Sequence, residues 1–196
     1  MTMLDLLNWV AFFLIVIASA GVLLSRDWRW SLVFLAVQYL GVFWLVQNHW
    51  PITMAAAKLV TGWMACAILG IAQLSANKTA EPETSWPQGR LFRLFTAGLA
   101  LLVALILALR AATWLRLSLP VSWGGLLLIV MGLLYLGNTA QTFRVILGLL
   151  TVLAGFEILY AAVESSILVA ALLAVVNLGL ALSGAYLIGE AEEQLE

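Results

Sequence analysis

Glu157 is the residue of this chain with the clearest capacity for chemistry, because it lies well inside an apolar run. The run extends from Phe143 to Ser165 and is long enough to cross a bilayer. A carboxylate at such depth costs about 2.5 kcal/mol or more to insert, so it usually faces the interior of a helix bundle and serves a function. The chemistry expected of Glu157 is proton handling. A purely structural, hydrogen-bonded acid is the alternative.

Helical spacing gives this run two unlike faces. One face is acidic and narrow and holds Ala154, Glu157, Ala161 and Glu164. The roughly opposite face carries small residues, namely Gly148, Gly155 and Ala162. Small residues let a neighbouring helix backbone approach closely in a membrane. We therefore expect this helix to pack between others with its acid turned inward. Glu164 is expected at the outer interface, as a solvated helix end or a second acid of the pathway.

A lysine in an earlier apolar run, Lys58, can pair with this acid. It shares a helical face with small or polar residues, namely Ala55, Thr61, Gly62 and Ala65. At a rise of ~1.5 Å per residue, Lys58 lies about 9 Å and Glu157 about 10 Å from the outer ends of their helices. Opposite charges are thus expected at similar depth. The alternative is that the long Lys58 stem carries its ammonium to the outer headgroups.

Asn177 is the third intramembrane candidate. It lies near mid-membrane on a face of small residues formed by Ala170, Ala174, Asn177, Ala181 and Gly184. Such an amide serves either as a hydrogen-bonding link between helices or as part of a polar pathway.

Composition places the chain among membrane proteins. Its 196 residues are 64% hydrophobic and 10% charged, and the mean hydropathy is +1.08. A soluble domain of this size could not bury so much apolar surface. The net charge of −1 gives no indication of a nucleic-acid partner. Cys66 and His49 are each the single residue of their type, so we expect no disulfide, metal site or cofactor, and no catalytic site of the chain's own.

The hydropathy pattern predicts an all-α bundle of seven transmembrane helices. The first is read as a retained helix, not a cleaved leader, because Asp5 precedes it and no basic residue does. The predicted spans are Leu6–Ser25, Trp30–Val46, Ile52–Leu74, Leu91–Ala112, Val121–Gly137, Phe143–Ser165 and Ile167–Ile188.

One polar segment divides the chain. Residues 76–90 include Pro82 and Pro87 and are read as a cytoplasmic linker. It separates a three-helix front bundle, residues 1–75, from a four-helix rear bundle, residues 91–189. An acidic tail, residues 190–196, follows.

The distribution of basic residues predicts the orientation, because cytoplasmic connections carry an excess of Lys and Arg. One side has six, namely Arg26, Arg29, Lys78, Arg90, Arg93 and Arg144. The other side has two, Arg110 and Arg116. We therefore expect a multi-pass protein of the cell inner membrane, with the amino terminus outside and the carboxyl terminus in the cytoplasm.

The rear segment from Val121 to Ile188 resembles the three-helix K subunit of bacterial NADH–quinone oxidoreductase. The shared features are a glycine-bearing first helix, a short polar turn, an Arg and the motif Gly155-Phe156-Glu157-Ile158-Leu159. The whole chain, with its longer front and Lys58, is similar to component E of the formate-hydrogenlyase type of membrane-bound hydrogenase. The likeness covers about a third of the chain at the level of motifs and the rest by layout.

The resemblance implies that Glu157 belongs to a chain of intramembrane charged groups that couples a hydrogenase or quinone module to antiporter-like subunits. Such subunits would be the partners, with the lipid bilayer around them. K subunits usually carry a second carboxylate in the last helix, where this chain has Asn177. An amide cannot take up or release a proton, so Lys58, Glu164 or a neighbouring subunit would have to replace it.

Two functions of different class follow. The first is a proton-pathway subunit of an ion-translocating oxidoreductase or antiporter complex. The second is a non-conducting scaffold or assembly subunit, in which Glu157 and Lys58 fasten helices together. A solitary transporter is less favoured, because the loops are short and the helices lack the Gly- and Pro-broken segments typical of such proteins.

Overall fold

The computed structural model describes residues 3–25, 27–76, 90–115, 117–139 and 141–193. These residues form seven α-helices and no strand: α1 (Met3–Leu24), α2 (Trp28–Gln47), α3 (Ile52–Ser75), α4 (Arg90–Leu115), α5 (Leu119–Gly137), α6 (Thr142–Val163) and α7 (Ile167–Glu193). Each contains a stretch long and apolar enough to cross a membrane. The prediction of a helical, multi-pass protein is confirmed at this level.

The largest difference from the predicted bounds is at the end of the chain. Helix α7 continues to Glu193, so residues 190–193 are helical and not a separate tail. Helix α4 likewise extends to Leu115, three residues past its predicted end. Residues 77–89 of the predicted linker and residues 194–196 lie outside the described part of the chain.

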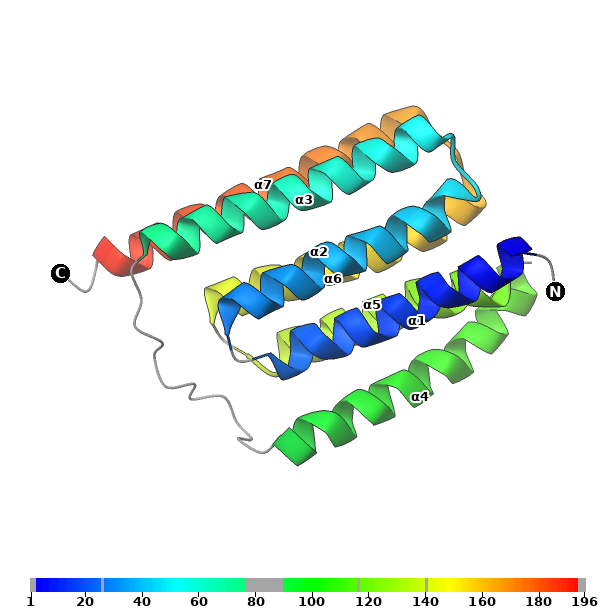
Figure 1. Cartoon of the computed structure of the whole chain (residues 1–196), viewed down its shortest axis with the longest axis horizontal. Coiled ribbons are helices and arrows are strands. Elements are labelled where there is room, and N and C mark those ends of the chain that lie inside the picture. The colour runs from blue at the N-terminus through cyan, green and yellow to red at the C-terminus, as the bar shows by residue number, and fades with distance from the viewer. Residues whose placement is uncertain (1–2, 26, 77–89, 116, 140, 194–196) are drawn as a thin grey trace.

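The helices are arranged in two layers (Figure 1). Helices α1, α2 and α3 form one layer, and α5, α6 and α7 lie behind them in the same order. Each front helix runs in the same direction as the helix behind it. Helix α4 packs at one edge, against α5 and α1. The helices before and after the linker thus share one continuous hydrophobic core between the layers.

The contact between α5 and α6 is made by glycines. A Cβ added to Gly155 would lie 2.6 Å from the carbonyl oxygen of Gly125, and one added to Gly132 would lie 2.8 Å from that of Gly148. Both distances are too short for a side chain, so the two backbones touch directly. The small-residue face predicted for α6 is therefore confirmed, and α5 is the helix that packs against it.

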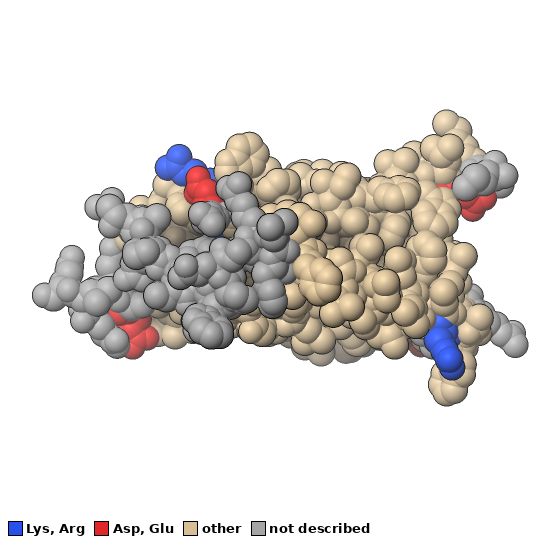
Figure 2. All heavy atoms as spheres, turned by 90° about the horizontal axis from the view of Figure 1, so that it is seen from below, with Lys and Arg blue, Asp and Glu red and all other residues tan. Residues whose placement is uncertain are grey.

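On the face shown in Figure 2, the charged side chains of the described residues lie near the ends of the molecule. Coloured side chains lie near the two ends, and the tan surface between them shows no charged side chain of the described residues. A belt of this kind is what a bilayer requires, because a charge exposed to hydrocarbon is costly. Lys58 and Glu157, which are buried inside the bundle, are the exception, and they define the candidate site.

Candidate functional site

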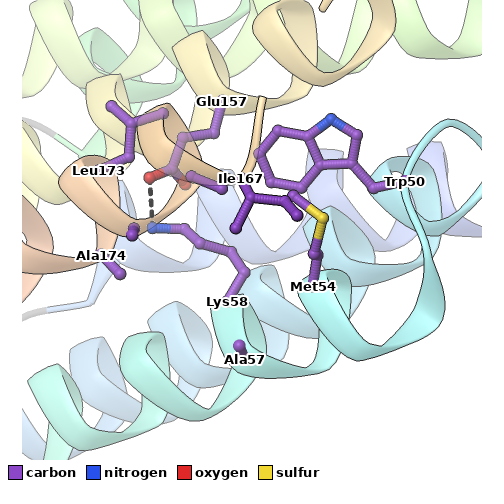
Figure 3. A pocket seen from close by; sticks show the side chains of 10 residues that line it. Trp50, Met54, Ala57, Lys58, Glu157, Ile167, Leu173 and Ala174 are labelled. Carbon is purple, nitrogen blue, oxygen red and sulfur yellow. Dashed lines mark ion pairs between the residues drawn. The ribbon is translucent and has the colours of Figure 1, made fainter. Parts of the chain in front are cut away.

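A buried ion pair joins Lys58 and Glu157. The Lys58 Nζ atom contacts the Glu157 Oε1 atom, and the two side chains are 5% and 1% exposed. Figure 3 shows the two groups facing each other. Lys58 lies six residues after the start of α3, about 9 Å along the helix axis, and Glu157 lies six residues before the end of α6. The alternative that Lys58 reaches the outer headgroups is wrong, because its ammonium is held inside.

The pair spans a diagonal of the bundle. Helices α2 and α7 each pack against both α3 and α6, so α3 and α6 lie across from each other. A side chain on α3 must therefore reach through the interior to meet one on α6. The long stem of lysine makes this possible. Small residues that share its face, such as Ala55 and Ala65, are fully buried and let the neighbouring helices come close.

The ion pair has few other polar contacts. Lys58 Nζ and both carboxylate oxygens of Glu157 make no hydrogen bond to another described residue. The attraction within a buried pair offsets the cost of removing its charges from water only when further hydrogen bonds satisfy its atoms. This pair lacks them, so transfer of one proton from the ammonium to the carboxylate gives a neutral amine and acid with no other bond to break. The arrangement is therefore suited to holding and passing on a proton.

A cavity of about 150 Å³ adjoins the pair. Its other lining side chains are apolar: Trp50, Met54, Ala57, Ile167, Ala170, Ala171, Leu173 and Ala174. They come from the α2–α3 turn, the first turns of α3 and the first turns of α7. The cavity thus lies at the same end of the bundle as the pair, which is the predicted outer end.

Asn177 takes part in a separate contact deeper in the bundle. Its Oδ1 atom accepts a hydrogen bond of 2.9 Å from the hydroxyl of Tyr39 on α2. Tyr39 packs on Gly62, where an added Cβ would lie 2.6 Å from the tyrosine ring. The Nδ2 atom of Asn177 and both amide atoms of the buried Gln38 have no hydrogen-bond partner among the described residues. Asn177 thus links α7 to α2, and it lies one turn beyond the cavity residue Ala174.

Glu164 lies apart from the ion pair, at the exposed end of α6. Its Oε1 atom accepts a bond from the backbone N–H of Ser165, and its carbonyl accepts a 3.0 Å bond from the indole N–H of Trp50. Of the four residues predicted for the pathway, Lys58 and Glu157 are in contact, Asn177 lies deeper, and Glu164 is at the surface.

The sequence did not single out Tyr39 and Trp50 as site residues. Trp50 is only 4% exposed and lines the cavity. A tryptophan directly before a helix-starting proline, eight residues before Lys58, was the available signal. For Tyr39 the signal was the neighbouring Gln38, since two adjacent polar residues in an apolar helix cannot both face lipid at little cost.

The described residues contain no group of three or more His, Cys, Asp or Glu side chains that could hold a metal ion. No family model, no curated protein and no solved structure matches this chain.

Proposed function

We propose that the chain is a proton-pathway subunit of an ion-translocating membrane complex. The Lys58–Glu157 pair carries this proposal, because two titratable groups in contact inside a membrane helix bundle are costly to keep without a task. The pair exchanges one proton between its members. It then passes that proton to a neighbouring group or subunit when Glu157 is in its acid form.

Lys58 supplies the second titratable group that the last helix lacks. The position where a K-like subunit has a carboxylate is Asn177 here, and its amide is bonded to Tyr39. An amide holds a hydrogen bond but does not titrate. In the proposed mechanism Glu157 and Lys58 therefore form the proton-exchanging unit, and Asn177 fixes the position of α7 beside it.

The partners proposed are antiporter-like and hydrogenase- or quinone-module subunits. The support for them is the resemblance at Gly155-Phe156-Glu157-Ile158-Leu159 together with the apolar surface left exposed on the outer helices. Helix α4, for example, buries mainly a line of alanines, Ala97, Ala100, Ala104, Ala108 and Ala112, and leaves its large apolar side chains outward. In this proposal the protein lies in the cell inner membrane.

The proposed orientation has the amino terminus outside and the carboxyl terminus in the cytoplasm. It rests on the six-to-two distribution of basic residues and puts the cavity at the outer side. A reporter fused after Glu196 should be active only in the cytoplasm. Labelling of that end from the outside would mean that the orientation is the opposite one, and the direction of the proposed pathway would then be opposite too.

The test of function is Glu157→Gln in the intact, co-purified complex. The amide keeps the shape of the side chain but cannot take up a proton, so we expect normal assembly. Proton flux should fall by about 10²-fold or more, as is typical when a positioned proton-transfer group is removed. Glu157→Asp should retain part of the flux. Flux is measured in proteoliposomes under an imposed membrane potential.

The matched control for this test is Glu164→Gln, which removes an exposed acid from the end of the same helix. We expect it to leave both assembly and flux unchanged. Flux at the wild-type rate in an assembled Glu157→Gln complex would rule out the proton-pathway proposal.

A scaffold role is the second candidate, and one observation favours it. The same contacts tie distant helices together: Lys58 binds α3 to α6, and Trp50 binds the α2–α3 turn to the α6–α7 turn. In this role Glu157→Gln would either be harmless or prevent assembly. Measuring assembly and flux in the same variant separates the two candidates.

A further inference from the structure

The cavity beside the ion pair has two chemically different parts. Most of its wall is apolar, and its largest side chains are Trp50, Met54, Ile167 and Leu173. At one side are the ammonium of Lys58 and the carboxylate of Glu157, which are almost fully buried. Apart from the contact between the two groups, three atoms of this pair have no hydrogen-bond partner among the described residues. The cavity thus offers hydrogen-bonding groups at one point, and the rest of its wall is apolar.

Neither water alone nor a lipid chain alone matches this wall. A water molecule needs two to four polar partners and takes up about 30 Å³, so a cavity of this size would have to hold several, most of them against apolar groups. A lipid acyl chain would cover the apolar groups and leave the atoms of the pair without hydrogen bonds, which is costly in a medium without water.

The cavity size and its single polar point indicate a molecule with an apolar ring and one hydroxyl. An apolar cavity of about 150 Å³ accommodates a benzene-sized ring. A hydroxyl can donate one hydrogen bond to a carboxylate and accept one from an ammonium at the same time. We propose that this cavity is a binding site for a neutral hydroxylated six-membered ring of the phenol class, with its hydroxyl bonded to the Glu157–Lys58 pair from the cavity side and its ring against Trp50.

The small residues of the wall provide the space for the ring. Ala57 on α3 and Ala170, Ala171 and Ala174 on α7 all border the cavity. A larger side chain at one of these positions would occupy the volume that the ring needs. Ala57 and Ala171 are also exposed on the outside of the bundle, so enlarging them does not force a rearrangement of the core.

The experiment measures binding of 4-fluorophenol to the purified full-length chain in detergent by fluorine NMR, with empty micelles as the baseline. Fluorobenzene has the same ring without the hydroxyl. We expect saturable binding of 4-fluorophenol at least about tenfold tighter than that of fluorobenzene, as a hydrogen bond to a charged group predicts. Glu157→Gln should reduce this preference.

Two alanines of α3 give a matched pair of variants. Ala57→Leu should abolish saturable binding of both compounds, because Ala57 lines the cavity. Ala67→Leu adds the same side chain at an exposed site on the same helix outside the cavity, and binding should be unchanged. Ala171→Leu serves as a second cavity-filling variant if Ala57→Leu does not yield folded protein.

Three results would overturn the site. They are no saturable binding above the micelle baseline, equal affinity for the two compounds, and equal effects of Ala57→Leu and Ala67→Leu. The proposal concerns the same ion pair as the proposed function but does not rest on ion translocation. The binding assay contains no proton gradient. A negative binding result would therefore reject the phenol site only, and the proton-pathway proposal would still be decided by the flux measurement.

Discussion

The two faces of α6 are built in opposite ways. Toward α5, Gly148 and Gly155 bring the two backbones close together, and at Gly155 there is no room for a methyl group. Toward α3 and α7, Glu157 meets Lys58 beside the cavity. One face is close-packed and without charge, and the other is loosely packed and holds the buried ion pair. The comparison shows that close backbone packing and the buried charge are placed on different sides of the same helix.

The largest effect on stability is expected when one charge of the loose face is removed. Glu157→Leu leaves the Lys58 ammonium buried without a partner, which should cost about 3–5 kcal/mol. The double variant Lys58→Met/Glu157→Leu replaces both charges by apolar groups and should recover most of this loss. Unfolding in mixed micelles measures both. If the single and double variants are equally destabilised, Lys58 and Glu157 are not energetically coupled. The two faces of α6 would then differ less than the structure indicates.

The next effect tests the close-packed face. Gly155→Ala places a methyl group 2.6 Å from the carbonyl oxygen of Gly125 and 2.8 Å from the backbone nitrogen of Ile129. Backbone atoms cannot move aside cheaply, so we expect a loss of about 1–3 kcal/mol in the free energy of unfolding.

Gly179→Ala on α7 is the control for Gly155→Ala, because nothing lies within 4 Å of its added methyl group. Alanine is the better helix former by about 0.5–1 kcal/mol, so this variant should be neutral or more stable. Effects of the same sign in the two glycine variants would contradict the close contact between α5 and α6.

The smallest effect concerns the hydrogen bond between Tyr39 and Asn177. Tyr39→Phe removes the donor and keeps the ring on Gly62, so the expected loss is about 0.6 kcal/mol, the average for such bonds between membrane helices. Tyr186→Phe, at an exposed position of α7, should change nothing measurable. A loss for Tyr39→Phe as large as that for Glu157→Leu would mean that the hydroxyl belongs to the ion-pair site.

The helices and the depth of the charges could be predicted from the sequence, because both depend only on position along the chain. Hydropathy determines where a span begins and ends, and residue spacing along a helix converts directly into depth. Lys58 and Glu157 were therefore expected at the same level, and the structure shows them in contact. The glycines of α6 were also readable, because their spacing marks one side of the helix.

The lateral arrangement of the helices could not be predicted in this way. Depth is one coordinate, and it does not say which helices are neighbours in the plane of the membrane. The stacking of α3 on α7, the bond from Tyr39 to Asn177 and the bond from Trp50 to Glu164 all join segments more than 90 residues apart in the chain. They depend on the packing of the whole bundle, as does the cavity, which is formed by residues of three separate segments.

The position of Trp50 determines the side from which the cavity can be reached. Its indole borders the cavity and is bonded to the Glu164 carbonyl, so it closes the end of the bundle that faces the aqueous phase. The lining residues that are exposed, Ala57, Ile167 and Ala171, lie on the outward sides of α3 and α7. Access is therefore lateral, from within the bilayer. Occupancy of the cavity should follow the partition coefficient of a compound into lipid and not its concentration in water.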